Sequence, residues 1–184
     1  MPCSITAGRT VSCKDAVSGI RNVYIANYID IPAQTGYTIA SGLITVMATT
    51  PLEVYEYAVR RESSKLDISI ATDPKAGTTH FEQRLTLQFN KLNKDDADAV
   101  KILAYDRVVI IVQDNQDNLL VLGARNGMDM EGSSMTTGQN YGDQSGFSLT
   151  FVGREINEAL WCKPSAGPTT ALAPFDECTG VNVN

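Results

Sequence analysis

The chain has 184 residues, 43% of them hydrophobic and 20% charged, and its 21 acidic and 15 basic residues give a net charge of −6. This length suits one domain with a sizeable core, and the composition excludes a wholly disordered, collagen-like or coiled-coil chain. No apolar run reaches the roughly 18 residues of a membrane helix, and we expect no membrane partner and no secretory signal. The acidic balance argues against tight sequence-independent DNA binding, which depends on clustered Lys and Arg.

The dominant pattern is an alternation of apolar and polar residues, which is typical of strands with one buried face. It is clearest at 81–89 and recurs at 66–70 and 147–151. The run 108–112 is apolar throughout and predicts a strand buried on both faces, which forms a hairpin with 119–122 across an Asp- and Asn-rich turn. In chain order, the sequence predicts strands at 23–29, 38–48, 53–61, 66–70, 81–89, 108–112, 119–122 and 147–151.

One helix is predicted at 94–104. Asn93 is placed to cap it, aspartates in its first turn favour a helix N-terminus, and Ala97, Val100 and Leu103 recur at helical spacing. Because the helix leads directly into the apolar strand, we expect it to pack on a sheet. The predicted fold is mostly β (α+β), an antiparallel β-sandwich or barrel with one flanking α-helix.

We expect a single β-rich domain over 1–162. Its predicted core is Leu66, Ile68, Ile70, Leu85, Leu87, Phe89, Val100, Leu103, Val109, Ile111, Leu149 and Phe151, which share a phase on the strands and the helix. The polar segment 123–146 predicts one long loop that contacts between subunits would order. The segment 163–184 holds three prolines and no amphipathic pattern, and it predicts an extended C-terminal arm.

The four cysteines match no zinc-binding spacing, and the lone His80 cannot complete a Cys/His site near them. We expect four reduced thiols that pack as small apolar side chains, with a disulfide joining the two ends of the chain as the alternative. The cysteines are Cys3, Cys13, Cys162 and Cys178.

Catalytic patterns are nearly absent. His80 has no nucleophile motif beside it, and the chain contains no phosphate-binding glycine loop and no metalloprotease motif. We interpret the loop carboxylates as solvated turn residues rather than calcium ligands or an acid–base pair; they are Asp114, Asp117, Asp129, Glu131 and Asp143. The sequence therefore predicts no enzyme, no cofactor and no metal site.

Residues 108–158 contain a series of motifs that resembles a known family. An apolar hairpin at 108–123 is followed by Asn126-Gly127-Met128-Asp129, by the run 137–143 (TGQNYGD), and by the alternating strand 146–155 (GFSLTFVGRE). With the opening segment 13–28, this resembles small virion proteins of tailed phages that infect Bacteroidetes-type hosts, including proteins of tail-tube type. The resemblance spans roughly 13–158 and includes no catalytic signature.

The resemblance implies a structural virion protein that is assembled in the host cytoplasm. Its subunits would form stacked hexameric rings whose strands join into a β-lined channel for DNA ejection, contacting other tail or neck proteins while DNA passes without specific binding. A neck or connector ring and a capsid-associated protein are the near alternatives. A monomeric β-sandwich binding module, with 123–146 as its ligand loop, is the alternative from another class.

Two sets of residues follow from this hypothesis. A channel wall is the solvated side of a sheet, so Glu53, Asp67 and Glu82 are expected to face the lumen with few Lys or Arg beside them. The competing interpretation places these carboxylates in cross-strand pairs with Arg60, Arg84 or Lys65 on the outer surface. The expected inter-subunit loop residues are Asn126, Asp129, Tyr141 and Asp143.

Overall fold

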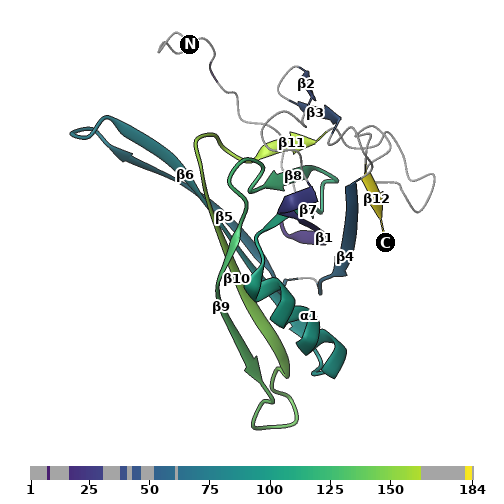
Figure 1. Cartoon of the computed structure of the whole chain (residues 1–184). Coiled ribbons are helices and arrows are strands. Elements are labelled where there is room, and N and C mark those ends of the chain that lie inside the picture. Colours follow the sequence, from purple (N-terminus) through teal and green to yellow (C-terminus); the bar gives the residue numbers. More distant parts are fainter. Residues whose placement is uncertain are drawn as a thin grey trace.

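The computed structural model describes residues 8, 17–30, 38–40, 43–46, 52–60, 62–162 and 181–183, and it is mostly β, with two sheets and one α-helix (Figure 1). The first strands are β1 (Ile20–Asn27), β2 (Thr38–Ala40), β3 (Leu43–Val46) and β4 (Leu52–Ala58), with a short 3-10 turn, η1 (Tyr28–Asp30), after β1. The middle holds β5 (Lys65–Asp73), β6 (Thr78–Asn90), α1 (Lys94–Tyr105), β7 (Val108–Asp114) and β8 (Leu119–Leu122). The last strands are β9 (Asp129–Thr136), β10 (Gly146–Glu155), β11 (Leu160–Cys162) and β12 (Val181–Val183).

The larger sheet has eight strands in the order β12-β4-β1-β7-β8-β11-β3-β2. It curls, because Val54 near one end of this order and Ile44 near the other belong to one buried cluster. Tyr24, Ile111 and Val121 from the central strands complete that cluster. The curled sheet therefore encloses its own apolar core.

The smaller sheet has four antiparallel strands in the order β5-β6-β10-β9. One of its faces packs on the outer side of β1 and β7, where Leu87 and Phe151 meet Val23 and Ile110. Helix α1 adds Leu103 to this second cluster, with Ala97 and Val100 beside it. As predicted, β7 is buried on both faces, because alternate residues of it enter the two clusters.

Most of the sequence-based fold prediction is confirmed. The β7–β8 hairpin and the helix lie where the pattern placed them. Asn93 occupies the N-cap position of α1 with an extended backbone, although its side chain makes no capping hydrogen bond. Seven of the predicted core residues are buried, namely Leu85, Leu87, Leu103, Val109, Ile111, Leu149 and Phe151, and three pack partly buried against them, namely Leu66, Phe89 and Val100.

Two predicted core residues are wrong, because Ile68 is 38% exposed and Ile70 is 64% exposed. Both have the phase of the core face, but the β5–β6 hairpin extends past the rest of the molecule (Figure 1). Ile68 and Ile70 lie on its edge strand β5 and belong to neither buried cluster, so the second layer does not reach them. The alternation identified the face correctly, and the missing layer leaves that face exposed.

The expected long loop at 123–146 is also wrong. This segment contains a tight turn at 123–128, the eight-residue strand β9 paired with β10, and a shorter loop at 137–145. Of the predicted C-terminal arm, 181–183 forms β12, parallel to β4 in the eight-stranded sheet, and 163–180 lie outside the described residues.

The expectation of four reduced thiols is wrong for Cys162, which is disulfide-bonded and almost fully buried in β11. Cys3, Cys13 and Cys178 lie outside the described residues. Within the described part of the chain, no helix is long and apolar enough to cross a membrane.

Candidate functional site: the open face and edges of the four-stranded sheet

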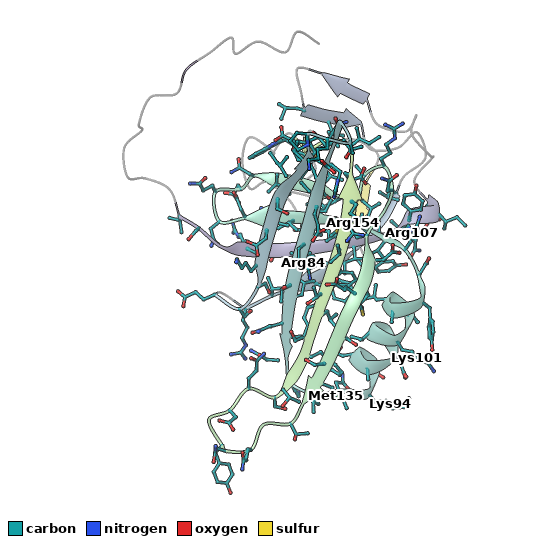
Figure 2. The ribbon with its side chains drawn as sticks, turned by 90° about the vertical axis from the view of Figure 1, so that its left-hand side faces the viewer. Arg84, Lys94, Lys101, Arg107, Met135 and Arg154 are labelled. Atoms are coloured by element: carbon teal, nitrogen blue, oxygen red, sulfur yellow. The ribbon has the colours of Figure 1, made fainter. Side chains whose placement is uncertain are left out.

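The four-stranded sheet has one face on the core and one face open to solvent, since successive side chains of a strand point to opposite sides. The open face is turned toward the viewer in Figure 2, where Arg84 and Arg154 lie near its middle. Its side chains are almost all polar; they include Asp67, Ser69, Glu82, Arg84, Thr86, Gln88, Ser148, Thr150 and Arg154.

The charges on this open face are paired. Glu82 lies 3.4 Å from Arg84 and 3.3 Å from Arg154, and Arg84 also donates to the carboxylate of Glu131 across β10. On the edge strand, Lys65 lies 2.9 Å from Asp67. The hydrogen bond from Arg84 lowers the pKa of Glu131, and the same bond raises the pKa of Arg84. Three acidic and three basic side chains therefore balance one another.

The three residues expected to line a lumen divide between the two sheets. Asp67 and Glu82 lie on the open face, whereas the exposed Glu53 lies on β4 of the eight-stranded sheet, beside β12. The expectation that few basic residues accompany the acids does not hold, because Arg84 and Arg154 form ion pairs with Glu82. The competing interpretation is met in part. Asp67 pairs with Lys65 and Glu82 with Arg84, but within one strand. The pair that crosses strands joins Glu82 to Arg154.

Both edges of this sheet are free in the described part of the chain. Strand β5 pairs only with β6, and β9 pairs only with β10. Unpaired edge strands present a row of backbone N–H and C=O groups that can bond to another chain. The sheet therefore offers two places, on opposite sides, where a further strand can join.

Two buried polar side chains fix the turn at 123–128. The Gln83 side chain accepts a hydrogen bond from the backbone N–H of Gly123 at 2.9 Å. The Glu155 carboxylate accepts from the N–H groups of Arg125 at 3.0 Å and Asn126 at 2.7 Å. The Asn126 amide in turn donates to the carbonyl of Arg154 at 2.8 Å. Asn126 is therefore part of a clamped turn inside the subunit.

The remaining expected loop residues lie at the two ends of β9. Asp129 begins the strand and lies 3.3 Å from Arg107. In the loop that follows β9, the Asp143 carboxylate accepts hydrogen bonds from the N–H groups of Gln139 at 3.0 Å and Asn140 at 2.7 Å, and these bonds lower its pKa. Tyr141 is fully exposed beside them. The loop at 137–145 is thus locally ordered and projects one aromatic ring.

The described residues gather no catalytic or metal-binding constellation. They include no group of three or more His, Cys, Asp or Glu side chains that could hold a metal ion. His80 is exposed on β6 in the projecting hairpin. A groove of about 470 Å³ lies between β4, the end of β6 and α1, with Tyr57, Phe89 and Asp96 in its lining.

Comparison with known protein families, curated proteins and solved structures finds no match to this chain.

Sequence reasoning considered Arg84 and Lys65 as partners of the expected lumen carboxylates only in the competing interpretation, and it missed Arg154 and Glu131. The alternation alone could have placed Arg84 and Arg154 on the open face, because each lies an even number of positions from polar residues of its own strand. Glu131 could not be placed in this way, since it lies where the β9–β10 register shifts and no simple alternation gives its direction. Glu155 also follows the alternation, but nothing local indicates that it binds the turn at 123–128.

Proposed function

We propose that the protein is a structural virion component of a tailed phage that assembles itself into rings, and that the rings stack into a tail tube. The observation that carries this proposal is the four-stranded sheet, which has a covered apolar face, an open polar face and two free edges. Such a sheet can continue from one subunit to the next without burying an unpaired strand.

Strand directions support continuation around a ring. The four strands alternate in direction, so β5 and β9 run antiparallel to each other. Rotation about a ring axis preserves the direction of every strand, so β9 of one subunit would meet β5 of the next in antiparallel orientation. The contact is heterologous, and a heterologous contact that closes generates a ring.

The stagger between the free edges supports closure. Ser69, at the centre of β5, lies opposite Glu82 of β6. Ser133, near the centre of β9, lies opposite Leu149 of β10, which in turn lies opposite Leu87 of β6. The edges are thus offset by five residues along β6, about 17 Å, while four strands span about 19 Å. This ratio corresponds to a strand tilt of about 40°, within the range of about 35–45° typical of closed barrels.

In such a ring the open polar face would line the channel, because the eight-stranded sheet covers the other face. Asp67 and Glu82 would then face the lumen and Glu53 would lie outside it. Arg84 and Arg154 are engaged by carboxylates, so few free cations would bind the phosphates of passing DNA. This charge arrangement suits a conduit that DNA crosses without specific binding.

The two ends of the sheet suit contacts between stacked rings. The β5–β6 turn lies at one end of the long sheet and the 137–145 loop at the other (Figure 1). Tyr141 and the Asp143-braced backbone would then meet the hairpin turn of the next ring. A neck or connector ring would use the same lateral contacts without repeated stacking, and a monomeric binding module would leave both edges unused.

Negative-stain electron microscopy and light scattering of the purified protein test the proposal. We expect rings with a central channel, stacked into tubes, and a mass that is a multiple of 19.9 kDa. Single unstacked rings would favour the neck or connector role. A 19.9 kDa monomer at all concentrations tested would contradict the proposal and favour the binding module.

A further inference from the structure

The β5 edge of the four-stranded sheet carries an apolar row that its own subunit does not cover. Ile68 and Ile70 are 38% and 64% exposed, and they lie on the same face as the buried Leu85 and Leu87. Their backbone belongs to a regular ladder with β6, so the row is held in place rather than disordered. A well-ordered apolar row at a sheet edge indicates a surface that another chain covers.

The opposite edge carries a matching uncovered surface. Met135 on β9 has the phase of the core face, since it is opposite Phe147, yet it is 66% exposed. Helix α1 contacts β9, and it carries two further exposed apolar side chains, Ile102 at 67% and Tyr105 at 83%. Figure 2 shows Met135, Lys94 and Lys101 along this side of the sheet, away from β5.

The ladder geometry brings the two surfaces together. The apolar face continues from β9 to the β5 strand of the next copy only if the register between them is shifted by an even number of residues. The two edges are offset by five residues, so the nearest even shifts are four and six. A shift of six places Ile68 of the next copy beside Met135. A shift of four places Leu66 there and Ile70 beside Met130. A shift of four sets two apolar pairs across the contact, and a shift of six sets one, because Ile70 then lies beside Ser133.

We propose that β9 and α1 form a docking platform for the apolar side of the next copy's β5–β6 hairpin, with Ile68 and Ile70 packing against Met135, Ile102 and Tyr105. This inference rests on the ring proposed above and names the contact that would give the ring its direction. The occupant is a second copy of this chain, because the uncovered row and the platform lie on opposite edges of one sheet and share its phase. Backbone pairing alone would tolerate other registers, whereas the apolar contact selects one.

Complementation between two blocked variants tests the inference. The hairpin variant Ile68→Asp/Ile70→Asp keeps its platform, and the platform variant Ile102→Asp/Met135→Asp keeps its hairpin. We expect each alone to be a monomer by light scattering. An equimolar mixture should form a heterodimer of twice the 19.9 kDa chain mass and nothing larger, because only one working contact remains.

Matched controls place the same charge on the same strands but on the open face. Ser69→Asp lies between the two isoleucines and Ser134→Asp lies beside Met135, so both should still form rings. If the hairpin variant unfolds at a lower temperature than the wild type, Ile70→Asp alone replaces it, because Ile70 is the more exposed of the pair.

Three outcomes are decisive. Rings formed by either blocked variant alone, or a mixture that stays monomeric, would overturn the docking contact while leaving the ring itself intact. A wild-type protein that never assembles would instead contradict the proposed function. A heterodimer in the mixture, with monomers in each separate sample, supports the contact.

Discussion

A disulfide bridge between neighbouring subunits would test both the continuous sheet and its register. Ser69 on β5 and Ser134 on β9 are exposed, and both lie on the open face. Replacing each with Cys should leave the fold intact, because neither side chain enters the core. Within one subunit the two positions are three strands apart, about 14 Å or more. That distance exceeds the roughly 7 Å limit between the Cα atoms of a disulfide, so no bridge can form inside a subunit.

Across the proposed contact, the register decides which pair can bond. Ser134 is level with Gln88 on β6, Ser69 with Glu82 and Asp67 with Arg84. A shift of six therefore sets Ser69 opposite Ser134, and a shift of four sets Asp67 opposite Ser134. The pair that is two residues out of register would have its Cα atoms about 7–8 Å apart, outside the usual range for a disulfide.

The assay is oxidation of assembled protein followed by non-reducing electrophoresis. Either Ser69→Cys/Ser134→Cys or Asp67→Cys/Ser134→Cys should give a ladder of covalent oligomers, and the other should not. The largest band gives the number of subunits in the ring, with six expected from the phage resemblance. Each single-cysteine variant should give no ladder, and the wild type controls for the native cysteines. Rings that yield no ladder with either pair would refute the β9–β5 continuation.

Three further predictions concern the subunit itself. Leu87→Ala should lower the free energy of unfolding by roughly 2–5 kcal/mol in urea denaturation, because Leu87 is fully buried, whereas Ile70→Ala should change it little; equal losses would contradict the two-layer core. Glu155→Ala should lower the free energy of unfolding by about 1–3 kcal/mol for each N–H of the 123–128 turn that loses its acceptor, and Glu155→Gln should lower it less. An unchanged melting temperature in Glu155→Ala would show that these hydrogen bonds do not stabilise the subunit. Because its hydrogen bonds depress the pKa of Asp143, its bracing of the loop should persist above the usual aspartate pKa and be lost only as pH falls through the depressed value; amide exchange of the 137–145 loop as fast at neutral pH as in Asp143→Asn would contradict this.

The strands that the sequence predicted are those in which the residue pattern alone indicates which side chains are buried. In β6 and β10 alternate side chains enter a core, and β7 has apolar residues on both faces, so the pattern is visible without any partner. Strand β9 was missed because its 129–136 sequence is mostly Gly, Ser, Thr and acidic residues. Its strand conformation comes from pairing with β10, which no local pattern reports.

The errors within predicted elements have a similar origin. Alternation assigned Ile68 and Ile70 to the apolar face correctly, but whether a layer covers that face depends on where the eight-stranded sheet ends. The disulfide of Cys162 likewise depends on a distant part of the chain. Periodicity predicts the direction of a side chain, whereas burial and partners depend on tertiary contacts.

The balanced charges change how the open face would act as a channel wall. A wall of unpaired carboxylates would repel DNA but would also hold like charges close together within one ring, where each subunit repeats the same face. Pairing Glu82 with Arg84 and Arg154, and Arg84 with Glu131, removes this repulsion and engages both arginines. These pairs are partly exposed, so each contributes little to stability, and their effect is to keep the face free of excess charge of either sign. A neutral polar wall suits passage better than a strongly charged one, because it neither traps phosphates nor opposes closure of the ring.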